Sequence, residues 1–343
     1  MATTETKMLD SIIASRRAVL LGAGALAATA ALGGEKKAAA AVPATLNDTQ
    51  ILNFALNLEY LEAQFYTLAT EGVTADKSAN KPISLGGSTA GAVTVKANPK
   101  VPFVNTAVQS YGLEIALEER NHVTFLQGAL GTAAVAQPAI NLQSSFVTLG
   151  SLAGVPNYDP FANDLYFLLG SYIFEDVGVT AYHGGALAIS KTNLTAAAGI
   201  HAVEAYHAGI VRTLLTQVDQ GLVTVGGGGQ GVALSVANAI SNVRATVDGT
   251  LGKLPTDAPG LTGQDDFGIN YKITAPLNGV GGPYLTSNID DEGKLTAANA
   301  TTYTYSNYVC FGRTPQQVLD IVYASASGAK GGFFPNGLNG DIS

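Results

Sequence analysis

Two Glu-x-x-His motifs constrain this chain more than any other feature of its sequence. The first runs from Glu119 to His122 and the second from Glu204 to His207. With 11 glutamates and four histidines among 343 residues, about 0.13 such motifs are expected by chance. Helical residues three apart lie on one face, so each motif can present a carboxylate and an imidazole to one cation. The motifs therefore predict helices that carry metal ligands.

The segment 46–220 has the apolar periodicity of long amphipathic helices. We expect four of them, at about 47–70, 103–128, 161–188 and 194–220. Their predicted starts are an N-cap at Asn47 or Asp48, prolines at 102 and 160, and an N-cap at Thr192 or Asn193. The connection at about 129–160 is long enough to run the length of a bundle. This predicts a four-helix bundle with a long crossover rather than an up-down one.

The first and third predicted helices each carry a glutamate followed seven residues later by a tyrosine. These pairs are Glu59 with Tyr66 and Glu175 with Tyr182. Seven residues are two helical turns, so each tyrosine lies on its glutamate's face, about 10.5 Å along the axis. Four glutamates and two histidines from four helices are the ligand set of a carboxylate-bridged two-metal site.

Charge supports a metal site independently. Four ionised carboxylates inside a bundle would each cost several kcal/mol to desolvate, whereas two divalent cations would cancel their charge. Without metal, some of them should hold protons through raised pKa values. The single cysteine, Cys310, excludes a thiolate cluster and is expected to be an inert core residue. The net charge of −8 argues against a nucleic-acid surface as the main function.

Longer stretches of the sequence resemble ferritin-like proteins. Residues 57–66 and 118–122 look like the first two helices of ferritins, and residues 204–207 resemble bacterioferritins, rubrerythrins and manganese catalases. The run LNFALNLEYLE at 52–62 is similar to an exported, desiccation-related group of ferritin-like proteins. Arg-Thr-Pro at 313–315 and the terminal GGFFPNG are similar to the same group.

This resemblance implies an all-α, ferritin-like four-helix bundle with a long crossover, plus an extra helix and a loop-rich C-terminal extension. It implies that two divalent ions, iron or manganese, are held by Glu59, Glu119, His122, Glu175, Glu204 and His207. Tyr66 and Tyr182 are either plain core residues or functional ones that orient the glutamates or relay an electron.

The sequence leaves two of these ligand positions open. Glu62 lies one turn from Glu59 and is the alternative to it. Asp176 directly follows Glu175, so either acid can face inward, although the register of Tyr182 favours Glu175.

Three further residues lie close to the predicted ligands. Glu118 is expected to be a solvated neighbour of Glu119. His201, one turn before Glu204, is a spare ligand or a donor to a ligand. His183 is expected to be a packed or surface histidine.

Residues 1–41 predict an export signal. Arginines at 16 and 17 precede an uncharged run at 18–34, and an alanine stretch suited to cleavage follows. The paired arginines resemble the twin-arginine signature of proteins exported in the folded state. We expect a mature protein in the periplasm, cell envelope or extracellular space, with no membrane span. An uncleaved anchor is the alternative, although the run is short for a span.

Residues 221–343 differ in composition from the bundle. We expect a fifth helix at about 233–251 and an irregular stretch at 252–312. Thr314, Pro315 and Gln317 predict the start of a short helix. An irregular stretch of this length cannot bury a core alone, so we expect a Gly-rich extension packed on the bundle.

The leading hypothesis for function is an exported two-metal redox protein that reacts with peroxide or dioxygen in oxidative or desiccation stress. The alternative is a non-catalytic protectant or interaction protein of the cell envelope, with a structural or vestigial metal site. Iron storage in a closed shell is a weaker third hypothesis, because the long connections and the extension would obstruct shell contacts. The expected partners are metal ions and peroxide or dioxygen. The sequence does not decide whether the protein forms a homo-oligomer.

Overall fold

The structure is a computed structural model that describes residues 45–186, 188–249, 268–269, 312–326, 328 and 330–343. The predicted signal at 1–41, Cys310 and most of the stretch 252–312 lie outside these residues. Within the described part, no helix combines the length and the apolarity that crossing a bilayer requires.

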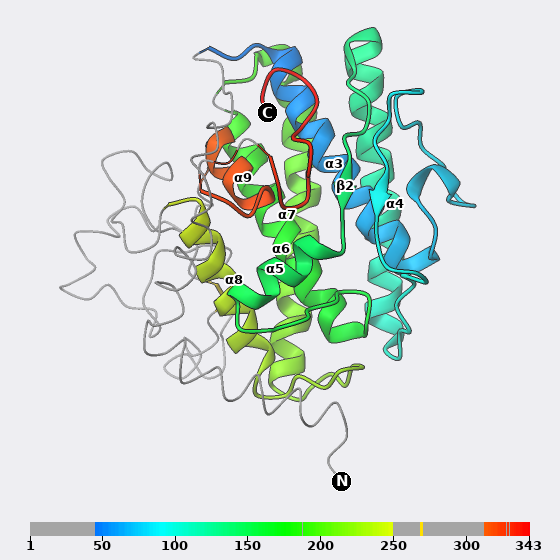
Figure 1. The fold of residues 1–343 in the computed structure, drawn as a ribbon, viewed down its shortest axis with the longest axis vertical. Coiled ribbons are helices and arrows are strands. Elements are labelled where there is room, and N and C mark those ends of the chain that lie inside the picture. Colours follow the sequence, from blue (N-terminus) through cyan, green and yellow to red (C-terminus); the bar gives the residue numbers. More distant parts are fainter. Residues whose placement is uncertain (1–44, 187, 250–267, 270–311, 327, 329) are drawn as a thin grey trace, which may run out of the picture.

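Four long helices form the bundle, and each overlaps one of the predicted helical segments (Figure 1). They are α3 (Asp48–Glu71), α4 (Thr106–Leu130), α6 (Asp164–Ala186) and α7 (Lys191–Asp219). The α3 helix packs mainly on α4, and α6 mainly on α7. The predicted all-α bundle is therefore confirmed.

Two predicted helix starts were wrong because polar side chains, not prolines, fix them. The α4 helix begins at Thr106, where the Asn105 side chain accepts hydrogen bonds from two backbone amides of the first turn. The α6 helix begins at Asp164, where the Asn163 side chain accepts a hydrogen bond from the amide of Tyr166 in the first turn. The buried Asp164 carboxylate accepts hydrogen bonds from amides at Val104, Asn105 and Gly226 and so ties two loops to this end of α6.

The fourth predicted helix also begins at a different residue from the one expected. Its N-cap is Ser190 rather than Thr192 or Asn193. The backbone amide of Ser190 donates to Asp48 in the first turn of α3, at 2.9 Å, and its hydroxyl bonds the same carboxylate. The start of α7 is therefore fixed by a contact with another helix.

The crossover between α4 and α6 runs along α3 and contains structure that the sequence did not reveal. It holds a short helix, α5 (Ser144–Leu152), the 3₁₀ turn η2 (Gly131–Ala133) and a strand, β2 (Ile140–Asn141). Strand β2 pairs in parallel with β1 (Val93–Thr94) from the first connection, which also holds the 3₁₀ turn η1 (Ala75–Lys77). Side chains of Asn53 and Gln64 bond the crossover at Ala133 and Gln137. The predicted long crossover is confirmed.

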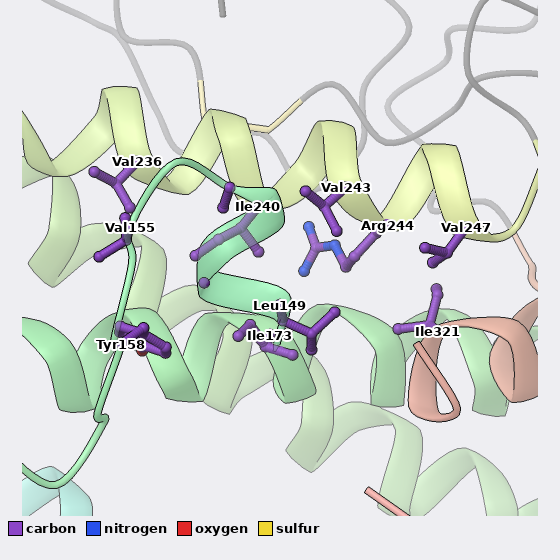
Figure 2. A pocket seen from close by; sticks show the side chains of 12 residues that line it. Leu149, Val155, Tyr158, Ile173, Val236, Ile240, Val243, Arg244, Val247 and Ile321 are labelled. Atoms are coloured by element: carbon purple, nitrogen blue, oxygen red, sulfur yellow. The ribbon is translucent and has the colours of Figure 1, made fainter. Parts of the chain in front are cut away.

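Helix α8 (Ala233–Val247) lies against α5 and α6 on the outside of the bundle (Figure 1). An apolar pocket lies between these helices. In Figure 2 the apolar side chains of α8 point toward Leu149 and Ile173, and Arg244 lies among them. The helix ends four residues earlier than predicted, because Gly249 adopts a left-handed conformation with φ of 74°.

Buried arginines connect α6 to α7 and α8. Arg212 of α7 and Arg244 of α8 both donate to the carboxylate of Asp176, at 2.6 Å and 2.8 Å. Both guanidinium groups also lie over the ring of Tyr172, at 5.3 Å and 4.5 Å from its centroid. The buried carboxylate and the ring thus have two positive partners from neighbouring helices.

The described C-terminal residues pack on the bundle. The predicted capping box between Thr314 and Gln317 opens α9 (Pro315–Val322), which packs against α6. The ring of Phe333 lies at 5.0 Å from Phe146 and 4.9 Å from Phe174, measured between centroids. The GGFFPNG turn therefore contributes to the core.

Candidate metal centre

The structure brings all six predicted ligand residues together at the centre of the bundle. A seventh residue, Glu62, joins them. None of the seven residues is more than 7% exposed. We call this set the Glu–His cluster: Glu59, Glu62, Glu119, His122, Glu175, Glu204 and His207.

One half of the Glu–His cluster surrounds His122. Its Nδ1 atom lies 3.1 Å from Glu59, 3.4 Å from Glu119 and 3.8 Å from Glu204. These four residues come from α3, α4 and α7. Each offers one ligand atom within 4.8 Å of the others, which is close enough for one cation.

The other half surrounds His207. Its Nδ1 atom lies 2.9 Å from Glu119 and 3.3 Å from Glu175. Glu119 therefore belongs to both halves, with one oxygen facing His207 and the other facing His122. A carboxylate in this position can bridge two cations.

Glu62 completes a third group together with Glu175 and Glu204. The sequence offered Glu62 as an alternative to Glu59, but both glutamates lie in the Glu–His cluster, so neither replaces the other. The two are one turn apart on the inner face of α3. Periodicity alone could not decide between them, because both positions face the interior.

Asp176, the alternative to Glu175, lies outside the cluster. It faces away, toward Arg212 and Arg244, as described above. Of the two neighbouring acids, Glu175, which the register of Tyr182 favoured, is the one that lies in the Glu–His cluster.

The two tyrosines connect opposite helices. The hydroxyl of Tyr66 on α3 donates to Glu175 on α6, and the hydroxyl of Tyr182 on α6 donates to Glu59 on α3. Each tyrosine therefore contacts the glutamate of the partner helix rather than the one seven residues before it. Both hydroxyls orient carboxylates of the Glu–His cluster.

Glu118 has a contact that the sequence analysis missed. Its side chain is 34% exposed, as expected of a solvated neighbour, yet its carboxylate lies 2.7 Å from Nε2 of His207. A carboxylate on this nitrogen holds the ring so that Nδ1 points into the cluster. Glu118 precedes Glu119 on α4, and only the packing of α4 against α7 creates the contact.

His183 and His201 lie outside the Glu–His cluster. They face each other from α6 and α7, with ring centroids 6.0 Å apart, and both are half-buried. His201 contacts none of the cluster residues among the interactions described, so a role as donor to a ligand gains no support.

Burial raises the pKa of several carboxyls in the cluster. It raises the pKa of Glu59 to about 7, with His122 opposing the increase and Glu119 adding to it. Burial and neighbouring carboxylates raise the pKa values of Glu62 and Glu204 well above the ordinary range.

At the two histidines of the cluster, the charges of neighbouring carboxylates outweigh the effect of burial on the pKa. Burial by itself lowers the pKa of His122, but Glu59 and Glu119 outweigh it and raise the value to about 12. The same competition raises the pKa of His207, where Glu175 is the largest favourable partner. Burial opposes ionisation of Glu119, yet His122 and His207 hold its pKa below the ordinary value. Without cations, protons balance the charge of the cluster, and metal binding must displace them.

The donor set fits metal ions. Several buried atoms form no hydrogen bond within the described residues, although some of them lie close to one another: Glu62 Oε2, both carboxylate oxygens of Glu119, Glu175 Oε2, Glu204 Oε2 and His207 Nδ1. Leaving such groups unpaired is costly, and a cation would satisfy them. Carboxylate oxygens with two imidazoles suit divalent iron or manganese.

Comparison with known proteins agrees with this geometry. The sequence profile of a family described as "Ferritin-like domain" matches residues 47–217. The desiccation-related protein PCC13-62 of Craterostigma plantagineum is 34% identical over 175 residues, which cover 49% of this chain and 53% of that protein. The chain thus spans about half the length of this relative.

A second relative aligns over more of the chain. The ferritin-like catalase Nec2 of Nesocodon mauritianus is 24% identical over 307 residues, covering 86% of this chain and 84% of that protein. No solved structure matches the chain. The four-helix bundle, the Glu–His cluster and the profile match together show that this chain belongs to the family of proteins with a ferritin-like domain.

Proposed function

We propose that the Glu–His cluster holds two iron or manganese ions and that the protein reacts with peroxide or dioxygen. The observation that carries this proposal is Glu119, whose two oxygens face the two halves of the cluster. One ion is assigned to Glu59, His122 and Glu204, and the other to Glu175 and His207, with Glu119 shared between them.

Two bound redox-active ions would supply or accept the electrons by which peroxide is reduced or oxidised. The residues of the chain prepare the site for this chemistry. Tyr66 and Tyr182 hold the carboxylates of Glu175 and Glu59 in place. Burial excludes bulk water from the cluster, which strengthens electrostatic interactions inside it.

Glu62 is the residue suited to handle protons. Burial and the neighbouring carboxylates raise its pKa well above the ordinary value, which favours the protonated form. Its Oε2 atom has no hydrogen-bond partner in the described part of the structure. We assign it the role of holding the proton that a reacting oxygen takes up or releases.

Peroxide is the favoured substrate because the more widely aligned relative is named a ferritin-like catalase. The test is peroxide consumption by the metal-loaded, full-length protein. We expect activity in the wild type and its loss in Glu119→Ala. The exposed Glu114, on the same helix, provides the control Glu114→Gln, which should retain activity. Equal peroxide consumption by wild type and Glu119→Ala would contradict the proposal.

We also propose that the protein is exported through its twin-arginine-type signal and serves in stress defence outside the cytoplasm. Replacing Arg16 and Arg17 with lysines should retain the protein inside cells of its host. Fractionation with unchanged export of this variant would contradict the proposed route.

A second function, protection without catalysis, is favoured by the similarity to a desiccation-related protein. In a drying assay on a labile enzyme, Glu119→Ala separates the two functions. Full protection by this variant would favour the non-catalytic function, whereas loss of protection would favour the metal centre.

A further inference from the structure

The chain contains four histidines, and only two of them lie in the Glu–His cluster. The other two, His183 and His201, face each other across the contact between α6 and α7. Nδ1 of each ring is buried and has no hydrogen-bond partner in the part of the chain described. A buried, unpaired ring nitrogen needs a physical explanation, and two on facing rings point to a shared ligand.

The state of the His201 ring favours a metal ion as that ligand. A neutral imidazole carries a lone pair on one ring nitrogen and can bind a metal ion through it. Burial, with His183 adding to it, lowers the pKa of His201 and so favours the neutral ring.

The spacing of the two rings is compatible with one shared ion. Their centroids lie 6.0 Å apart with an angle of 33° between the ring planes. Two imidazoles bound to one ion through bonds of about 2.0–2.1 Å have centroids roughly 5–6 Å apart. A small movement of the two side chains would therefore let both rings bind the same ion.

We propose that His183 and His201 form a separate site for one divalent transition-metal ion, through which ions load the Glu–His cluster. Among the described residues, no third Asp, Glu, Cys or His joins this pair, so water completes the coordination. Two imidazoles with water favour zinc, cobalt, nickel, copper or ferrous ions over magnesium and calcium, and allow exchange.

The position of the site explains the loading role, which rests on the proposed metal centre. His201 precedes Glu204 by three residues, a rise of about 4.5 Å along α7. Both histidines are half-buried, whereas Glu204 is 1% exposed. The pair thus lies between solvent and the buried cluster, one turn from a cluster carboxylate.

The test is a Zn²⁺ titration of the full-length, metal-free, tag-free protein with ¹⁵N-labelled histidine. Ring nitrogens of the four histidines are followed and assigned with His183→Gln and His201→Gln. We expect the resonances of His183 and His201 to shift and saturate. The double variant His183→Gln/His201→Gln should bind one Zn²⁺ fewer per chain while retaining the ions of the cluster.

A matched variant separates this proposal from the proposed function. In Glu119→Ala/His207→Ala the cluster is damaged, yet the shifts of His183 and His201 should persist. If the cluster binds no metal, this response still decides whether the outer site exists. Circular dichroism of each variant establishes that it is folded before binding is compared.

Unchanged His183 and His201 resonances at Zn²⁺ concentrations that saturate the cluster would overturn the proposal. So would equal Zn²⁺ stoichiometry in the wild type and the His183→Gln/His201→Gln variant. The loading role is tested by stopped-flow uptake of Co²⁺ into the cluster, followed by absorbance. Uptake should be slower in the double variant, and an unchanged rate would contradict the loading role.

Discussion

A histidine ring is a better metal ligand when its second nitrogen is held, and Glu118 holds that of His207. We predict that Glu118→Gln weakens metal binding about 10–100-fold, because the amide holds the ring less strongly than the carboxylate. Competition with a chromophoric chelator measures this affinity. Glu114→Gln, at an exposed position on α4, should leave it unchanged, and equal affinities of all three proteins would contradict the account.

Burial of Glu59 predicts a pH effect on the metal-free protein. Burial raises its pKa from an ordinary value of 4.5 to about 7 in the folded chain. The protonated carboxyl therefore favours folding, and the contribution present below pH 4.5 is lost as the pH rises toward 7. This difference corresponds to at most about 3 kcal/mol.

The measurement is the free energy of unfolding in urea at pH 5 and pH 7.5, for metal-free wild type and Glu59→Gln. The amide does not titrate, so the wild type should lose more stability than the variant between these pH values. Parallel pH profiles would show that Glu59 titrates normally.

Among single residues, the sequence placed acids and histidines on the inner helix faces without showing which of them contact one another. The two Glu-x-x-His motifs suggested pairs within one helix, and Glu119 does lie near His122, but His207 contacts Glu119 and Glu175 of other helices. The roles of Glu62 and Glu118 depend on contacts between helices. No local sequence pattern distinguishes an acidic side chain that contacts a distant histidine from one that lies in solvent.

At the level of helices, the connections between α6, α7 and α8 depend on Asp176 and its two arginines. Removing one partner of a buried ion pair leaves an uncompensated charge, so Asp176→Ala should destabilise the protein by about 3–5 kcal/mol. The half-buried pair of Lys96 and Asp159, whose side chains are 34% and 35% exposed, offers the control. Asp159→Ala should cost about 0–1 kcal/mol. Urea unfolding measures both, and equal losses would contradict this difference.

Helix existence was predictable from periodicity, whereas helix starts were not. Pro102 and Pro160 suggested starts for α4 and α6, but each helix begins a few residues later. Asn105 and Asn163 fix those starts, because their side chains accept hydrogen bonds from first-turn amides. The start of α7 at Ser190 depends instead on a contact with Asp48 of α3, and such a long-range contact has no signature in the local sequence.

Across the whole molecule, the C-terminal turn fills the space between α5 and α6. Phe333 is fully buried against Phe146 and Phe174. Phe333→Ala should destabilise the fold by about 3–5 kcal/mol through lost burial and the cavity left behind. Thermal unfolding measures this loss. A change below about 1 kcal/mol would indicate that the turn is not part of the cooperative core.

The central claim concerns the metal ions, and elemental analysis of the mature protein purified from its own host tests it directly. We expect about two iron or manganese ions per chain, one for each half of the Glu–His cluster. Glu119→Ala/His207→Ala should lose both, because Glu119 is shared between the halves. A folded wild-type protein without iron or manganese, or with the same content in the double variant, would contradict the account.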